Sequence, residues 1–118
     1  MTVAELRTAL AAALSTVTGV DVRPYTVKSP RLGDGWVTLV RAVPDGYRTA
    51  AATVTAFVVL GPDEQLAEQK ADELLVPLLD AAAGIGGDVV VESVTVVAGT
   101  NAAPVYALTV TLTAEVEQ

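Results

Sequence analysis

The sequence contains no cysteine and no histidine among its 118 residues. Without cysteine, the chain has no disulfide, no redox-active thiol and no thiolate ligand for a metal ion. Without histidine, it lacks the side chain that most often acts as a general base and as a ligand for transition metals. Catalysis would have to rest on carboxylates, lysine or tyrosine alone. We therefore expect a protein that is not an enzyme and that has no catalytic residue, cofactor or metal site.

Long apolar runs are also missing, although 52% of the residues are hydrophobic. No stretch reaches the roughly 18 consecutive apolar residues that a transmembrane helix needs. The N-terminal segment has no basic run before its apolar part, and Glu5 and Arg7 interrupt it. We expect one domain over residues 1–118, without a targeting segment or membrane span, that stays in the cytoplasm of the cell that makes it.

The glycines and carboxylates do not form a known ligand motif. Residues 33–35 and 84–87 are glycine-rich, but they match neither the phosphate loop nor the dinucleotide-binding fingerprint, and we interpret them as turns. Asp72 and Glu73 are adjacent, so their side chains do not converge on one side of a helix. Aromatic residues lie among the cations of residues 23–48, as in proteins that bind single-stranded nucleic acid. The net charge of −7, however, would repel a nucleic acid, so the sequence does not favour this function.

Local patterns predict a first helix over residues 3–18. Thr2 and Glu5 form a T-x-x-E capping box at its start. Apolar residues then recur at helical spacing, and we expect Gly19 to end the helix in the left-handed conformation.

A hairpin is predicted in the middle of the chain. Residues 20–35 contain two prolines and a Gly-Asp-Gly turn signal, so we expect a loop there, with a short edge strand near 20–23. Strands over 36–42 and 48–60 follow, joined by a turn at Pro44-Asp45-Gly46. The threonines of the second strand are expected to face outward.

A second helix and two more strands complete the predicted order. Pro62 opens the helix, Pro77 is expected to kink or break it, and strands follow over 88–97 and 105–116. In the last strand the even positions are apolar and should face the core, while the threonines face the other way. The helix's expected buried face consists of Leu66, Ala67, Ala71, Leu74, Leu75, Leu78, Leu79 and Ala82.

The predicted fold class is α+β. The expected order is α-β-β-α-β-β in a two-layer sandwich, with a mainly antiparallel sheet and both helices on one face.

Charge is distributed unevenly along the chain. Residues 23–48 hold five cations against two carboxylates, a net charge of +3, whereas residues 63–80 hold one cation against six carboxylates, a net charge of −5. In the simplest interpretation, the acidic side of the second helix is exposed to solvent and keeps the protein soluble. The alternative is a contact with the basic region of a neighbouring copy, which closes into a ring if the rotation permits. The candidate interface residues are Arg23, Lys28, Arg31, Arg41, Arg48, Glu64, Glu68 and Asp72.

The order of elements resembles the minor tail and tail-terminator proteins of long-tailed bacteriophages. The resemblance extends over nearly the whole chain and rests on element order, on the junction FVVLGPDEQLAEQKADELL at residues 57–75, and on a final strand that ends in an acidic tail. Pro77 and the proline-interrupted loop at 24–30 match no motif of the family, and no binding residue is carried over.

The resemblance implies a structural protein of the virion tail, in its neck region, assembled in the host cytoplasm. Such proteins form a homo-oligomeric ring, expected to be a hexamer, on the last ring of the major tail-tube protein. They end tube growth and present a surface to the head-tail connector, while DNA passes through without specific binding. Two alternatives stay open: a head-tail joining or head-closure protein, and a ferredoxin-like module that binds a small ligand.

Overall fold

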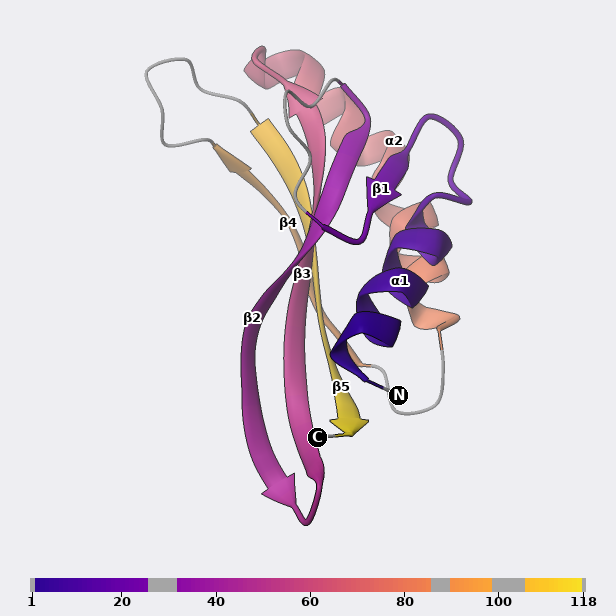
Figure 1. Cartoon of the computed structure of the whole chain (residues 1–118). Helices are drawn as coiled ribbons and strands as arrows, with labels where there is room; N and C mark the ends of the chain where they lie inside the picture. The colour runs from indigo at the N-terminus through magenta and orange to yellow at the C-terminus, as the bar shows by residue number, and fades with distance from the viewer. Residues whose placement is uncertain (1, 26–31, 86–89, 99–105, 118) are drawn as a thin grey trace.

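The computed structural model describes residues 2–25, 32–85, 90–98 and 106–117, and for residues 90–98 it describes the backbone alone. The α+β class is confirmed, with two helices and a mixed sheet. The sheet has five strands in the order β1-β2-β3-β5-β4, so the order along the chain contains one strand more than the α-β-β-α-β-β prediction (Figure 1). The elements are α1 (Val3–Leu14), β1 (Asp21–Arg23), β2 (Asp34–Gly46), β3 (Thr49–Gly61), α2 (Glu64–Ala83), β4 (Val90–Ala98) and β5 (Tyr106–Glu117).

Helix α1 begins at the predicted capping box and ends earlier than predicted. The backbone N–H of Glu5 donates to Thr2 Oγ1 at 3.2 Å, and that of Thr2 donates to Glu5 Oε1 at 3.3 Å. The helix ends at Leu14 with Ser15 as its cap, so the prediction of a helix to residue 18 was wrong. The reason lies at Ser15, whose hydroxyl accepts from the Val22 N–H at 2.9 Å and so ties the chain to β1. Gly19 has the predicted left-handed conformation, with φ of 86°, but it does not cap the helix.

The hairpin of β2 and β3 is longer than predicted, and its turn lies elsewhere. Pro44, Asp45 and Gly46 still belong to β2, and the strands are joined by Tyr47 and Arg48. The prediction of a turn at 44–46 was therefore wrong. The β1–β2 pairing is parallel, whereas every other pairing in the sheet is antiparallel.

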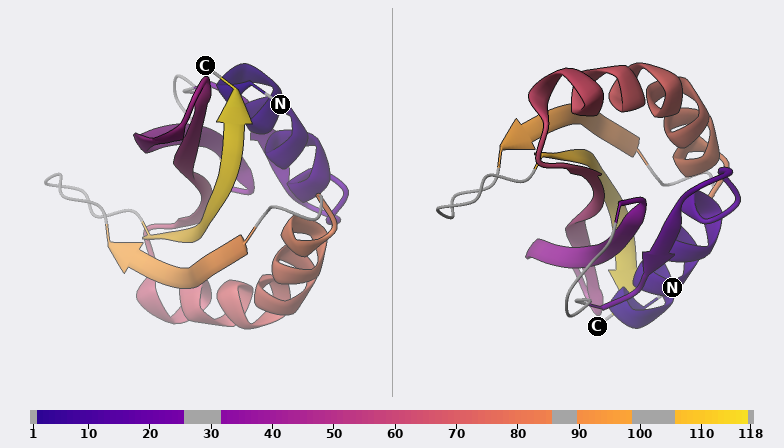
Figure 2. Two further views of the ribbon diagram at one scale, coloured as in Figure 1. Left: turned by 90° about the horizontal axis from the view of Figure 1, so that it is seen from below. Right: turned by 90° about the horizontal axis from the view of Figure 1, so that it is seen from above.

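The core forms between the helices and the even-numbered side chains of the central strands β3 and β5. Val54, Val58, Leu108 and Leu112 are fully buried there, which confirms the predicted inward face of β5. From the helices, Leu6, Leu10, Leu14 and Leu78 fill the same core. Figure 2 shows both helices running around the outside of the curved strands.

The threonines of β3 and β5 are not the exposed surface that the sequence suggested. Thr53, Thr55 and Thr109 are only 5%, 8% and 5% exposed. The Thr53 and Thr113 hydroxyls are hydrogen-bonded across the strands at 2.9 Å, and those of Thr55 and Thr111 at 3.0 Å. Because β3 and β5 are the inner strands of the sheet, their neighbours shield this face and the hydroxyls satisfy one another.

Helix α2 is continuous through Pro77, so the expected break is absent, although Figure 2 shows that the helix curves along its length. Its buried side is narrower than predicted. Ala67, Ala71, Leu78 and Ala82 are buried, and Leu74 is partly buried. The prediction was wrong for three leucines: Leu66 is 58% exposed, and Leu75 and Leu79 are each 37% exposed.

Candidate functional site

The predicted interface residues lie on three separate elements. Arg41 and Arg48 lie in the β2–β3 hairpin, and Arg23 lies on β1, where it forms an exposed ion pair with Asp21 at 3.3 Å. The acidic residues Glu64, Glu68 and Asp72 are all exposed on α2. Among the described members of the two sets, no ion pair joins a basic residue to an acidic one within one copy. Lys28 and Arg31 lie outside the described residues.

The folded chain reduces the charge contrast that the sequence suggested. Strand β5 ends beside the hairpin, where Glu115 pairs in register with Ala51, and Glu117 with Thr49. With Asp45 in the same hairpin, the described residues of the hairpin and the adjoining end of β5 include three carboxylates against the two cations Arg41 and Arg48. Charge alone therefore does not make the hairpin a strongly basic surface, and contacts of other kinds must contribute to any assembly.

Strand β2 presents an open edge along most of its length. Strand β1 pairs only with residues 34–36 of β2, and no other described strand pairs on that side. Every residue from Val40 to Arg48 is exposed, and the hairpin projects below the helices in Figure 1. A register shift at Val40 and the missing N–H of Pro44 protect this edge from uncontrolled pairing. An edge of this kind is available to a partner that fits its irregular shape.

The hairpin tip displays an aromatic side chain to solvent. Tyr47 is 86% exposed, the highest value among the exposed large hydrophobic residues of the described chain. Arg48 follows it in the left-handed backbone conformation, with φ of 63°, and its guanidinium lies 5.2 Å from the centre of the Tyr47 ring. A residue other than glycine costs about 1–2 kcal/mol in this conformation. The tip thus combines an exposed aromatic residue, an adjacent cation and local backbone strain.

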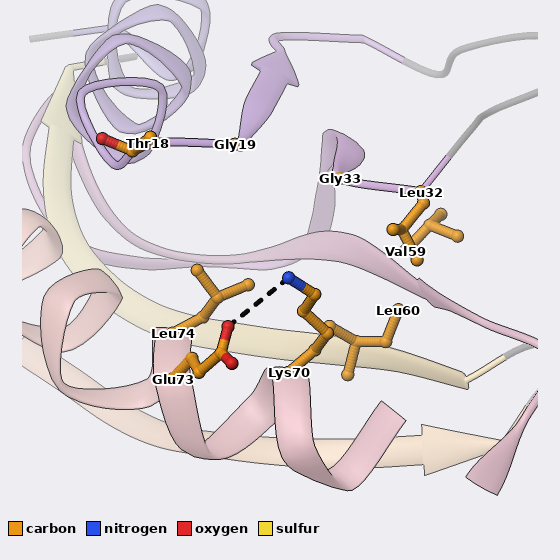
Figure 3. Close-up of a pocket in the computed structure, with 9 residues that line it drawn as sticks. All are labelled: Thr18, Gly19, Leu32, Gly33, Val59, Leu60, Lys70, Glu73 and Leu74. Atoms are coloured by element: carbon orange, nitrogen blue, oxygen red, sulfur yellow. Dashed lines mark hydrogen bonds and ion pairs between the residues drawn. The ribbon is translucent and has the colours of Figure 1, made fainter. Parts of the chain in front are cut away.

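An apolar groove lies at the other end of β3, where the strand enters α2. It measures about 210 Å³ and is lined by Leu32, Leu60, Pro62 and Leu66, with Asp63, Lys70 and Glu73 at its polar side. A smaller cavity of about 90 Å³ adjoins it and shares Leu32, Leu60, Lys70 and Glu73. Figure 3 shows the Lys70–Glu73 ion pair of α2, 3.4 Å long, facing the Leu32–Gly33 segment across this cavity.

The comparisons with known proteins do not name a family. No protein-family model matches the sequence, and no curated protein matches it either. Within the described residues, no group of three or more carboxylates is placed to hold a metal ion, and no helix is long and apolar enough to cross a membrane.

Sequence reasoning named Arg48 of the hairpin tip as an interface residue, but it missed Tyr47 beside it and it missed the groove. The signal for the tip was present, because a tyrosine between Gly46 and Arg48 follows a turn-rich segment and has no periodic partner. No comparable pattern in the sequence indicates the groove. Its leucines come from a loop, a strand and a helix, and only the fold brings Leu32, Leu60 and Leu66 together.

Arg7 is a second residue whose role the sequence did not reveal. Its Nη1 donates to the carbonyl oxygens of Val37, at 2.9 Å, and Pro24, at 3.2 Å, and its guanidinium lies 4.7 Å from the centre of the Tyr25 ring. Helix α1 is thereby joined to β2 and to the segment that follows β1. This arginine therefore contributes to the fold rather than to the charged surface.

We expect Arg7→Ala to lower the free energy of unfolding by about 2 kcal/mol, because two partly buried carbonyls lose their donor. Urea denaturation followed by circular dichroism measures the loss. Arg23→Ala is the matched control and should cost less than about 1 kcal/mol, since its ion pair is exposed. Equal losses for the two variants would show that the Arg7 contacts do not stabilise the fold.

Proposed function

We propose that this chain is a structural protein of a long-tailed bacteriophage that forms a ring on the end of the tail tube. The ring, expected to be a hexamer, ends tube growth and offers a surface to the head-tail connector, and DNA passes through it without specific binding. Its partners are further copies of the chain, the major tail-tube protein and the connector. Its place is the neck of the virion tail, after assembly in the host cytoplasm. A two-layer arrangement with both helices on one face of the sheet belongs to the same proposal.

The observation that carries the proposal is the open, projecting β2–β3 hairpin. An edge strand with exposed Val40 and Val43, 57% and 51% exposed, leaves backbone groups and apolar side chains to be covered by another chain. The other edge of the sheet is β4, so the two edges are different. Pairing of one edge with the unlike edge of the next copy is a head-to-tail contact, and such contacts close into rings when the rotation permits.

The cavities give less support to a module that binds a small ligand. Ligand pockets usually measure about 300–1,000 Å³ and enclose convergent polar groups. The groove and the cavity beside it measure about 210 and 90 Å³, and the polar side chains that line them include an ion pair between neighbouring turns of one helix. A space of this size suits one or two side chains of a protein partner. A larger hollow of about 460 Å³ lies on α1, but it is shallow and is lined by residues of that helix alone.

Tube growth in vitro tests the proposal. The major tail-tube protein of the same genome is allowed to polymerise with and without the purified chain, and tube lengths are measured by negative-stain electron microscopy. We expect shorter tubes with extra density at one end. A Leu6→Asp variant, which places a charge in the core, is the inactive control. Unchanged tubes would contradict the proposal, and binding to the isolated connector without binding to tubes would favour a head-closure protein instead.

A further inference from the structure

We infer that the hairpin tip of one copy, Tyr47 with Arg48, inserts into the apolar groove at the β3–α2 junction of the next copy. This inference rests on the proposed ring and names the surfaces that join its subunits. The groove is defined by Leu32, Leu60, Pro62 and Leu66 with Asp63 and Glu73 at its polar side.

The two surfaces cannot meet within one copy. Strand β3 runs from Thr49, next to the tip, to Gly61, at the groove, and its 13 residues span roughly 40 Å at the usual rise per residue. The longest dimension of the molecule is 46 Å. The tip and the groove thus lie at opposite ends of the sheet, and a tip that occupies the groove must belong to a second chain.

The chemistry of the tip matches that of the groove. The tip offers an aromatic ring that is almost fully exposed, and the groove offers leucines and a proline, of which Leu32 and Leu66 are 61% and 58% exposed. Tyrosine and arginine are both enriched among interface hot spots, which lie in well-packed pockets shielded from water. Both surfaces lose exposed apolar area when they meet.

Charge is complementary at the same contact. Among the described residues that line the groove, Asp63 and Glu73 stand against one cation, Lys70, which already pairs with Glu73. Asp63 Oδ1 accepts from the Leu66 N–H as the helix cap, and the second oxygen of its carboxylate is a further acceptor for an incoming cation. Arg48 follows Tyr47 directly and brings a guanidinium to this side of the groove. The acidic row Glu64, Glu68 and Asp72 then acts at longer range, steering the approach rather than forming the contact.

The contact joins two different surfaces, so each subunit uses its tip once and its groove once. Two copies that exchange tips would close as a two-fold dimer, whereas a tip passed on to the next copy generates a closed ring or an open filament. The proposed function requires the second arrangement, and the mass of the assembly distinguishes it from the dimer.

Tyr47→Ala is the first test. The side chain contacts solvent in the isolated chain, so thermal unfolding should be unchanged, whereas the dissociation constant between subunits should rise about 30-fold or more, as for a truncated hot spot. Analytical ultracentrifugation over a concentration series measures the constant. Val76→Ala, on α2 outside the groove lining and 57% exposed, is the control and should have a much smaller effect.

Cross-linking tests the position of the tip directly, because the natural chain has no cysteine. Arg48→Cys in one sample and Gln69→Cys, in the groove, in another are mixed and oxidised; Tyr47 stays in place as the anchor. We expect disulfide-linked dimers from this mixture. A mixture of Arg48→Cys with Val76→Cys, an exposed residue two turns further along α2, should give only background.

The outcomes separate this inference from the proposed function. If the wild-type chain forms rings but Tyr47→Ala leaves their dissociation constant unchanged and the groove pair does not cross-link, the inference is overturned and the ring proposal stands. If Tyr47→Ala weakens binding to the tail tube and leaves self-association intact, the tip binds a different protein and the inference is again overturned. If the wild-type chain neither self-associates nor shortens tubes, both fail.

Discussion

Gly35→Ala should lower the free energy of unfolding by about 3 kcal/mol or more, and the variant should fold poorly at 37 °C. A Cβ atom at this position would lie 2.0 Å from the carbonyl oxygen of Phe57 and 3.2 Å from the Val22 side chain. The first of these atoms belongs to the backbone of the neighbouring strand, so the strands must separate to make room. Gly35 pairs with Val58 of β3 and with Val22 of β1, and separation there opens the centre of the sheet.

Gly84→Ala is the matched control for this substitution. At Gly84 the nearest atoms to an added Cβ lie 3.6 and 3.7 Å away, which is ordinary van der Waals contact. The same chemical change should therefore alter the free energy of unfolding by less than about 1 kcal/mol. Chemical denaturation of both variants compares them, and equal stability would contradict the close approach of β2 and β3 at Gly35.

Leu78→Ala should lower the free energy of unfolding by about 3 kcal/mol, which corresponds to a fall of roughly 10 °C in Tm for a chain of this size. Leu78 is fully buried in the core, one residue after Pro77. Leu79→Ala, the next residue along the same helix, is the control. Because Leu79 is 37% exposed, its truncation should cost less than about 1 kcal/mol.

This pair of leucines tests which side of α2 faces the sheet. Differential scanning calorimetry of both variants under one set of conditions gives the change in Tm for each. A larger loss at Leu79 than at Leu78 would mean that the helix is rotated by about one residue relative to the described structure.

The sequence predicted the parts of the fold that depend on neighbouring residues. The capping box at Thr2 and Glu5, the alternation in β5 and the edge strand near Asp21 all follow from local chemistry, and all three are confirmed. The buried side of α2 was predicted less well, since Leu74, Leu75, Leu78 and Leu79 supply more apolar residues than one helical face can bury. Only the position of the sheet decides between adjacent leucines.

Long-range features were beyond the sequence patterns. The parallel pairing of β1 with β2 and the placement of β5 between β3 and β4 depend on contacts between distant segments. The burial of Thr53 and Thr55 follows from their place on an inner strand, which an alternating pattern does not reveal. The groove is likewise formed by residues that are distant in the sequence. The charge difference between the basic region and the acidic helix is smaller than the sequence suggested, because the fold places Glu115 and Glu117 next to the hairpin.

Because the hairpin is less basic than the sequence suggested, we expect the assembly to depend less on salt concentration. Exposed ion pairs contribute less than about 1 kcal/mol each and are screened at high ionic strength, where the Debye length falls to about 3 Å at 1 M. An aromatic side chain buried in an apolar groove is not screened. We therefore expect salt to weaken the ring modestly and Tyr47→Ala to weaken it strongly.

The most direct measurement of the central claim is the mass of the purified chain by native mass spectrometry over a range of concentration and salt. One copy has a mass of 12.1 kDa. We predict a closed assembly, with a dominant species of about 73 kDa for six copies of 12.1 kDa, that persists with some dissociation as salt rises. A single species at 12.1 kDa under every condition would contradict head-to-tail assembly of this chain.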